Sequence, residues 1–424
     1  MARTITLDHI TKIEGHAKLR LKVDRGKVKQ CHLTATEGAR YFEGIVKGRR
    51  YNEAHEITSR ICGICSCAHV IAAIQAVEDA LGHAPTKQTK QLRLLLTLGE
   101  RIRSHATHLY FLSLPDYLGY ESALAMAKNH RPELQRALNL MRCGNGIIAT
   151  LGARDLHPVS ATVGGWLRLP KEGDMQKLRL SLDSVKKDAI ATCDLFNSLK
   201  YPEFESKGKY FSLIHPKDYP FLEGEFGFGK ERVKKSDYRS FLTEYHEPDS
   251  TANFVVKSDK RYFVGALARI NNNRKLLSVD AQKMLRQSGI SLPSRNPYHN
   301  TIAQAVELVH CVDQALEICS TLKIKPEEVE KIAPRAGTGV GMIEVPRGTL
   351  WHEYTLDAQG IITRTNIITP TAQNLLNIQE DIRQFVPRVL KKPRAQIILD
   401  VEKLIRSYDP CFSCSAHFLE VDWK

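Results

Sequence analysis

Two Cys-x-x-Cys pairs lie near opposite ends of this 424-residue chain. Cys62 and Cys65 belong to the stretch SRICGICSCAH, and Cys411 and Cys414 belong to DPCFSCSAH. Four thiolates from two such pairs suit a soft, tetrahedral metal site. Locally folded zinc modules separate their pairs by about 15–20 residues, whereas most of the chain lies between these two. The spacing therefore favours a four-thiolate site that the whole fold assembles, without naming the metal.

Other uses of cysteine fit this pattern less well. A thioredoxin-type dithiol needs only one pair, and a ferredoxin cluster shows a tighter run of cysteines. Disulfides are typical of small secreted scaffolds, which are far richer in cysteine than ten residues in 424. We therefore expect reduced thiols and a cytoplasmic protein. If each group continues as a helix, its members share one face: Cys62, Cys65 and His69 in the first group, and Cys411, Cys414 and His417 in the second.

The elements that must position these groups follow from the sequence pattern. Alternating apolar residues predict strands over 4–37 and 338–369. The proline at 115 is expected to end one long helix, and the aromatic, glycine- and proline-rich stretch 200–262 to be an irregular, partly β insertion. Helical periodicity with start and stop signals predicts helices over 68–82, 85–115, 132–151, 175–199, 264–288, 297–322, 371–388 and 396–407.

These elements predict an α+β, mostly helical fold. We expect a central helical bundle with small β-sheets formed by the N-terminal and C-terminal segments, and the metal site buried between them. If the strands near both ends pair, the two cysteine groups meet. The sequence has no internal repeat, low-complexity tract or clear linker, which predicts one intertwined domain over 1–417.

Composition and charge narrow the classes of function. Hydrophobic residues make up 42% and charged residues 25%, as in ordinary globular proteins. The net charge of +14 is scattered and lacks a nucleic-acid-binding motif, so we expect a solvated or partner-docking basic surface and no nucleic acid. The N-terminus lacks an apolar signal core, and no apolar run approaches about eighteen residues. No direct membrane insertion is therefore expected.

Six segments in order resemble motifs of the large, catalytic subunit of nickel-iron hydrogenases: TKIEGHAKL, RYFEGIVKGR, RICGICSCAH, EVPRGTLWH, ITPTAQN and DPCFSCSAH. The resemblance spans residues 5–417 and is strongest to the soluble cytoplasmic, bidirectional branch that is coupled to NAD(P) or a similar acceptor. It implies reversible heterolytic cleavage of dihydrogen. The alternative is a non-catalytic, zinc-stabilised scaffold of the same fold. Loss of a ligand cysteine would have pointed to that scaffold, and all four are present.

The resemblance also implies the metal ligands. Cys62, Cys65, Cys411 and Cys414 would bind nickel, and Cys65 and Cys414 would bridge it to an iron that carries carbon monoxide and cyanide. Polarizable thiolates tolerate changes in nickel charge, and bridging sulfurs hold two metals at short range. Cys411, a terminal ligand with free lone pairs, is implied to take the proton as dihydrogen splits. Cys67 is instead expected to be a packed thiol.

Three further residues match positions beside this centre. Glu14 resembles a carboxylate that relays protons when burial raises its pKa; from the residue alone it is a salt-bridging glutamate at a strand end. Arg347 resembles an arginine held above the iron, and the alternative is a turn residue after Pro346. Thr371 matches a hydroxyl that donates to cyanide, and the alternative is a helix N-cap.

The remaining matched residues are expected to support the centre. Asp116 is expected to pair with Arg347, or else to begin a turn after a proline. Asp409 is expected to orient the ligand loop, and His69 to hydrogen-bond a ligand thiolate.

The C-terminal end carries two further expectations. Glu43 and His417 match a second metal site, which is usually magnesium; because imidazole is an unusual magnesium ligand, iron is the other candidate. The last seven residues, 418–424, resemble a propeptide that an endopeptidase removes once nickel is in place. The resemblance therefore implies maturation factors and a C-terminal endopeptidase among the partners.

Electron transfer requires other chains. The sequence contains no Gly-rich phosphate-binding motif and no flavin motif, and its six remaining cysteines form no cluster pattern. An iron–sulfur small subunit is therefore an expected partner, with diaphorase-type or other electron-transfer subunits beyond it.

Overall fold

The structure is a computed structural model that describes residues 3–38 and 41–416. Its N-terminal segment forms an antiparallel sheet of three strands, β1 (Arg3–Leu7), β2 (Ala17–Asp24) and β3 (Lys27–Ala35). Every second residue of β2 is buried, so one face of this sheet belongs to the core. The strands expected at the N-terminus are thus confirmed.

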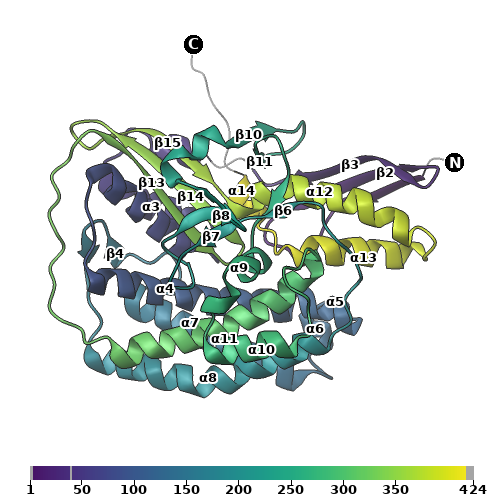
Figure 1. Cartoon of the computed structure of the whole chain (residues 1–424), viewed down its shortest axis with the longest axis horizontal. Helices are drawn as coiled ribbons and strands as arrows, with labels where there is room; N and C mark the ends of the chain where they lie inside the picture. Colours follow the sequence, from purple (N-terminus) through teal and green to yellow (C-terminus); the bar gives the residue numbers. More distant parts are fainter. Residues whose placement is uncertain (1–2, 39–40, 417–424) are drawn as a thin grey trace, which may run out of the picture.

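A bundle of long helices forms the lower part of the molecule in Figure 1. Helix α4 packs against α7 and α11, and α8 packs against the same two helices, so the four enclose a common core. Most residues of α11 are buried, which makes it the central helix of the bundle. The bounds are α4 (Lys87–Thr107), α7 (Arg131–Gly152), α8 (Glu172–Ser198) and α11 (Asn300–Thr321).

The helix that was predicted to end at Pro115 continues through it. After α4, a π-helical turn (His108–Ser113) leads directly into α5 (Leu114–Leu118), which ends at Gly119 with a φ of 79°. Pro115 lies in the first turn of α5, directly after the π-helical turn, where the i to i−4 hydrogen-bond pattern is already interrupted. The prediction that this proline ends the helix is therefore wrong.

A second antiparallel sheet lies against helix α3, at the upper left of Figure 1. Residues Gly339 and Gly341 of this sheet face α3, and a Cβ built on Gly341 would lie 2.1 Å from the carbonyl oxygen of Ala72. Only glycine allows the helix and the strand to approach so closely. The bounds are α3 (Ser66–Leu81), β13 (Gly337–Val345), β14 (Gly348–Leu356) and β15 (Ile362–Ile368).

The two sheets remain separate. Strands β1 to β3 form one sheet and β13 to β15 another, so the possible pairing between strands from the two ends does not occur. The ends of the chain meet instead through an isolated parallel bridge between Glu14 and Cys411. Helix α12 (Pro370–Val389) packs against β3, and α13 (Arg394–Ser407) packs against α12 and against the π-helical turn that follows α4.

The stretch between α8 and α9 is irregular and partly β, as predicted. Helical structure over 264–288 is split into α9 and α10 by a short 3-10 turn, Arg274–Leu276. The remaining strands are β4 (Ala161–Thr162), β5 (Gly165–Trp166), β6 (Lys209–Tyr210), β7 (Ser212–Ile214), β8 (Glu225–Phe228), β9 (Glu231–Val233), β10 (Leu242–His246), β11 (Asn253–Lys257) and β12 (Tyr262–Phe263). The remaining α-helices are α1 (Phe42–Val46), α2 (Ala54–Thr58), α6 (Ala123–Met126), α9 (Ala266–Asn273), α10 (Val279–Gln287), α12 (Pro370–Val389), α13 (Arg394–Ser407) and α14 (Phe412–Ser415).

One contiguous apolar core joins both ends of the described chain, from Ile5 in β1 to Cys414 in α14. The helical bundle, the small terminal sheets and the cysteines between them confirm the α+β, mostly helical prediction. Within residues 3–38 and 41–416, no helix combines the length and the apolar character needed to cross a bilayer.

Candidate metal centre

The four cysteines of the two pairs come together in one buried cluster. Their Sγ atoms all lie within 4.8 Å of one another. The distance is 3.8 Å between the Sγ atoms of Cys62 and Cys411, and 3.2 Å between those of Cys65 and Cys414. Thiolates at such separations can share one tetrahedral metal ion. The six other cysteines are also buried and free, and none of them joins this cluster in the described part of the chain.

Three of the four cluster cysteines lie just before helices, and Cys414 lies within the short helix α14. Cys62 has extended backbone angles after a 3-10 turn (Ser59–Ile61), and Cys65 is the N-cap of α3. Cys411 is likewise the N-cap of α14, where the backbone is extended. The shared-face prediction is therefore wrong for Cys62 and Cys65. Turns before each helix let the two pairs point toward a common centre, which two straight helices would not do.

The N-terminal segment closes over the second pair. The N–H of Phe412 donates to the carbonyl oxygen of Glu14 at 2.8 Å, and the N–H of Cys411 donates to Thr371 Oγ1 at 2.8 Å. Gly15 has a φ of +84°, and a Cβ on it would lie 2.6 Å from the backbone nitrogen of Ser413. Glycine is thus required where the two ends of the chain touch.

The cluster thiols shift one another's pKa values. Hydrogen bonds from the neighbouring cysteines, Cys411 first among them, hold the pKa of Cys62 well below its usual range. Burial raises the pKa of Cys411 above its ordinary value. Metal binding must therefore displace protons from this cluster, and the affinity for metal will rise with pH.

Arg347 and Asp409 form a buried ion pair beside the cluster. Arg347 Nε donates to Asp409 Oδ1 at 3.1 Å, and the other carboxylate oxygen accepts from Gln304 Nε2 at 2.9 Å. Burial lowers the pKa of Arg347, but Asp409 and the thiolates outweigh burial and hold that pKa well above its usual value. The Nη1 atom of this guanidinium has no hydrogen-bond partner among the described residues.

A small cavity of about 10 Å³ adjoins three of the four thiols. This volume holds roughly one water-sized molecule. Both the arginine and the threonine matched from the sequence reach it, while Cys62 does not. Its lining is Cys65, Ala68, His69, Val345, Arg347, Leu350, Pro370, Thr371, Cys411 and Cys414.

Glu14 lies beside the cluster, with its backbone bridged to Cys411. Burial is the main reason that its pKa is raised, and the charge of Cys62 adds to the rise, whereas Arg347 opposes it. The raised pKa agrees with the behaviour expected of a proton-relaying carboxylate. Thr371 does not act as a helix N-cap, because Thr369 occupies that position of α12 and the Thr371 hydroxyl accepts from Cys411 instead.

The expected partner of Asp116 differs in the structure. Asp116 does not bind Arg347: its Oδ2 accepts from Arg406 Nη1 at 2.6 Å, and its Oδ1 lies 2.5 Å from Lys12 Nζ. Asp116 also lies within α5 rather than at the start of a turn. Arg406 donates as well to the carbonyl oxygen of Thr11. The aspartate therefore anchors the segment before Glu14, and Asp409 takes the arginine that Asp116 was expected to hold.

His69 hydrogen-bonds another imidazole rather than a thiolate. Its Nδ1 lies 3.0 Å from His352 Nε2, and His352 Nδ1 lies 2.8 Å from the hydroxyl of Tyr354. His69 nevertheless lines the small cavity. His352 stands in the EVPRGTLWH motif and could have been singled out as its only histidine. Lys12 stands in TKIEGHAKL, but nothing in that motif points to Asp116, and Arg406 lies in none of the six motifs.

Of the two residues expected at the second metal site, the structure describes only Glu43. Glu43 Oε1 accepts from the backbone N–H of Ile367 at 2.6 Å. His417 lies outside the described residues, as does the stretch 418–424, so the second-metal site and the propeptide both remain predictions. Cys67 is fully buried, and burial raises its pKa well above the usual value, as expected of a packed thiol.

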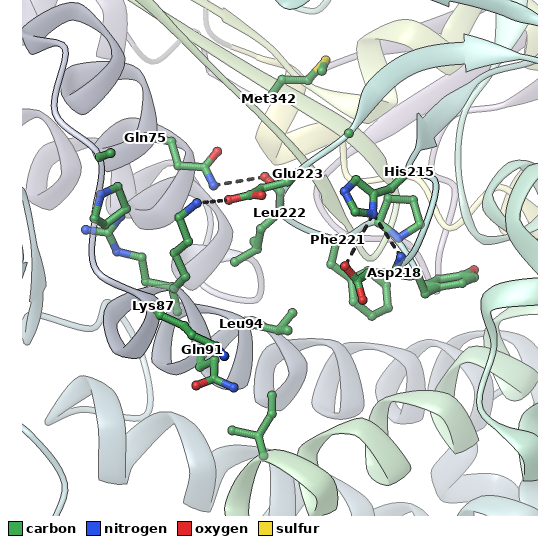
Figure 2. A pocket seen from close by; sticks show the side chains of 18 of the residues that line it. Gln75, Lys87, Gln91, Leu94, His215, Asp218, Phe221, Leu222, Glu223 and Met342 are labelled. Atoms are coloured by element: carbon green, nitrogen blue, oxygen red, sulfur yellow. Dashed lines mark hydrogen bonds and ion pairs between the residues drawn. The ribbon is translucent and has the colours of Figure 1, made fainter. Parts of the chain in front are cut away.

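A larger cavity, of about 740 Å³, opens elsewhere between α3, the start of α4 and the segment 215–224. Figure 2 shows Gln75 and Gln91 on its helical side and His215 and Asp218 on the opposite side. Gln75 is the lining residue of α3 nearest to the cluster, and it lies about 14 Å along the helix from its N-terminal end, where Cys65 lies. None of the four cluster cysteines lines this cavity.

The fold and the cluster together define a class of metalloenzyme: an α+β protein whose two chain ends enclose a four-thiolate centre beside a carboxylate and an arginine. The family described as nickel-dependent hydrogenase matches residues 40–146 and 269–417, and the one described as HoxL-like matches residues 4–37. The chain belongs to the nickel-dependent hydrogenase family. It is a hydrogenase large subunit, and the scaffold alternative is not favoured.

The relatives cover nearly the whole chain. The alpha subunit of sulfhydrogenase 1 from Pyrococcus furiosus is 32% identical, with 98% of each chain covered. The matching chain of the vhu F420-non-reducing hydrogenase from Methanococcus voltae is 31% identical over 91% of this chain and 99% of its own. A solved NAD+-reducing nickel-iron hydrogenase in the H2-reduced state shares the fold with a TM-score of 0.88 at 24% identity, covering 98% of this chain and 99% of the other.

Proposed function

We propose that this chain catalyses the reversible heterolytic cleavage of dihydrogen at the cluster of Cys62, Cys65, Cys411 and Cys414. The observation that carries the proposal is the convergence of four buried thiols from both ends of the chain within 4.8 Å. Family membership supports the same activity. The donor set fits nickel because soft thiolates select soft or borderline metals.

The residues at the cluster are assigned different roles in holding the two metals. Cys65 and Cys414, whose Sγ atoms lie 3.2 Å apart, would be the sulfurs that bridge nickel to iron, as the matched motifs imply. Arg347 Nη1 and the Thr371 hydroxyl, whose oxygen already accepts from Cys411, retain hydrogen-bond donors that would contact cyanide on an iron held there. When bound, the nickel-iron pair supplies the electron-accepting centre that polarises dihydrogen.

The chain itself moves the proton. Cys411 Sγ is the base that accepts it, since a terminal thiolate keeps free lone pairs. Glu14 lies in backbone contact with Cys411, and its raised pKa suits a carboxyl that picks up a proton and passes it on. Arg347 cannot serve as the base, because Asp409 and the thiolates hold it protonated.

Electrons leave through other chains of a complex. No second group of metal-binding cysteines exists among residues 3–38 and 41–416, so this part of the chain has no iron–sulfur relay. We propose two kinds of partner: an iron–sulfur small subunit, then a diaphorase-type or other electron-transfer subunit, with NAD(P) as acceptor in the cytoplasm. The sulfhydrogenase relative, which is the alpha chain of its enzyme, supports this arrangement, as does the fold neighbour that reduces NAD+.

Assay of the complex purified from its own host tests the acceptor. Dihydrogen-dependent reduction is measured with NAD+, NADP+ and a viologen dye in parallel. Reduction of a pyridine nucleotide at a rate comparable with the dye supports the NAD(P) link. Reduction of the dye alone would contradict that link while leaving the hydrogenase activity established.

Maturation is the last element of the proposal. Glu43 and His417 would hold magnesium or a second iron near the C-terminus, and residues 418–424 would be removed after nickel insertion by an endopeptidase that acts with other maturation factors. Intact-mass spectrometry of the active protein tests the cleavage: the mass should correspond to residues ending at His417. A full-length C-terminus in active enzyme would contradict it.

A further inference from the structure

Two side chains of helix α4 hydrogen-bond the backbone around the first cysteine pair. Glu100 Oε2 accepts hydrogen bonds from the backbone N–H groups of Cys67 at 2.7 Å and Ala68 at 3.3 Å. These N–H groups belong to the first turn of α3, directly after Cys65. The Glu100 side chain is buried, so the hydrogen bonds are shielded from water.

This support replaces an N-cap that Cys65 cannot supply. The first N–H groups of a helix lack intrahelical partners and are usually satisfied by the side chain of the N-cap residue. Cys65 occupies the N-cap position of α3 without a side-chain cap bond, since its thiol is directed to the cluster. Glu100 provides the missing acceptor from another helix, and its negative charge suits the positive end of α3.

Arg103 holds the same loop one helical turn further along α4. Its Nη2 donates to the carbonyl oxygen of Ile64 at 2.6 Å, between the two ligands of the first pair. Its Nη1 donates to the carbonyl oxygen of Asp155 at 2.8 Å and to Asn145 Oδ1 at 3.3 Å, which ties the loop to the end of α7 and the segment after it. Arg103 is buried as well.

We propose that Glu100 and Arg103 are positioning residues that fix the Cys62–Cys65 loop and tune the electron density of its thiolates with two opposite buried charges. Glu100 interacts electrostatically with Cys62 and with Arg103. Buried charges near a metal ligand act with little screening. The inference concerns residues beyond the proposed ligands and proton carriers, and it rests on the proposed site.

Because Glu100 and Arg103 carry opposite charges, removing each of them should shift the infrared bands in opposite directions. Infrared spectra are recorded on the nickel-loaded complex carrying Glu100→Gln or Arg103→Gln, in the region where iron-bound carbon monoxide and cyanide absorb. Burial raises the pKa of Glu100 to about 7, so the spectra are recorded well above that pH, where the carboxylate is charged. Glu100→Gln then keeps a carbonyl acceptor and removes the negative charge, so the bands should shift to higher wavenumber. Arg103→Gln removes the positive charge, so they should shift to lower wavenumber. Arg103→Lys retains the charge and should stay near the wild-type position.

The matched control is Glu78→Gln, at the other end of α3. Glu78 is also buried and accepts from both Nη atoms of Arg93 at 2.7 Å. This variant should lower thermal stability and leave the bands in place. Unshifted bands in both Glu100→Gln and Arg103→Gln, or shifts of the same sign, would overturn the proposal. If Glu100→Gln does not assemble, the two Arg103 variants decide alone, because equal shifts in both would also overturn it.

The failure of this inference is distinguishable from failure of the proposed function. Absence of all carbonyl and cyanide bands in the wild-type complex would contradict the nickel-iron centre itself. Wild-type bands that the α4 variants leave unchanged would contradict only the role of Glu100 and Arg103. Nickel content, measured on the same samples, shows whether a variant lost its metal or altered its environment.

Discussion

Arg347 and Asp409 are joined side chain to side chain, with 3.1 Å between Nε and Oδ1. Asp409 precedes Cys411 by two residues and has a φ of 50°, in the left-handed region. The arginine above the small cavity and the loop that carries the second cysteine pair are therefore mechanically linked. Any shift of this loop moves the guanidinium that faces the centre.

Asp409→Asn should isolate the charge of this link. Asparagine tolerates left-handed backbone angles, so the loop conformation is retained, but Arg347 loses its buried counter-charge. Displacement of a positioned group by about 1 Å can reduce turnover by roughly 10²-fold, and we expect a loss of that order in dihydrogen oxidation. Asp400→Asn on α13 is the control, because Asp400 binds Lys392 and Gln396 away from the cluster. Equal activity of the two variants would contradict the link.

Glu14→Gln should stop proton delivery while leaving the metals in place. General acid–base groups contribute about 10²–10⁴-fold to rate, and glutamine cannot carry a proton. Dihydrogen oxidation and isotope exchange between dihydrogen and D2O should both fall by that order, at unchanged nickel and iron content. Glu37→Gln serves as control, because Glu37 is a second carboxylate near enough to interact electrostatically with Glu14. Exchange at the wild-type rate in Glu14→Gln would show that protons take another route.

Each of the four cluster cysteines should be needed for nickel. Serine presents a harder oxygen ligand that nickel and iron bind poorly in a thiolate site. Cys62→Ser, Cys65→Ser, Cys411→Ser and Cys414→Ser should each lower the nickel content of the purified complex by at least about tenfold. Cys193→Ser, at a buried cysteine of α8, is the matched control and should keep its nickel. Full nickel loading in any of the four variants would remove that residue from the ligand set.

Stability should fall in mild acid because of buried neutral histidines. His310 accepts from the N–H of Ser278 at 3.0 Å and lies among Tyr219, Glu307 and Arg101; burial lowers its pKa from 6.5 to about 4. A depressed pKa means that the folded state disfavours protonation. The stabilisation is present above 6.5 and is lost as pH falls toward about 4, to a total of about 3 kcal/mol.

Thermal unfolding of the complex across that pH window checks this account. The wild-type unfolding temperature should drop as the pH is lowered, and His310→Asn, which retains an acceptor for Ser278, should show a smaller drop. An identical pH dependence in both proteins would assign the acid sensitivity to other groups.

The sequence carried the ligands and the residues closest to them, because their types and spacing belong to short motifs. The four cysteines, Glu14, Arg347 and Thr371 all reach the cluster or its cavity. Helix and strand positions followed as well, since periodicity is local.

Partnerships between distant segments could not be read in the same way. Asp116 binds Arg406 rather than Arg347, and which arginine reaches an aspartate depends on how α5 and α13 pack, not on neighbouring residues. The joining of the two chain ends through one bridge at Glu14, instead of a shared sheet, has the same origin. Pro115 shows that local prediction can also fail. Whether this proline ends the helix depends on the π-helical turn before it, which the apolar pattern does not reveal.

The infrared spectrum of the native complex, purified from its own host, tests the central claim most directly. Water and protein absorb weakly where carbon monoxide and cyanide on iron absorb. One carbonyl band and two cyanide bands that shift under dihydrogen are the predicted result. A blank spectrum from fully processed protein, together with zinc in the metal analysis, would contradict the account and favour a zinc-stabilised scaffold.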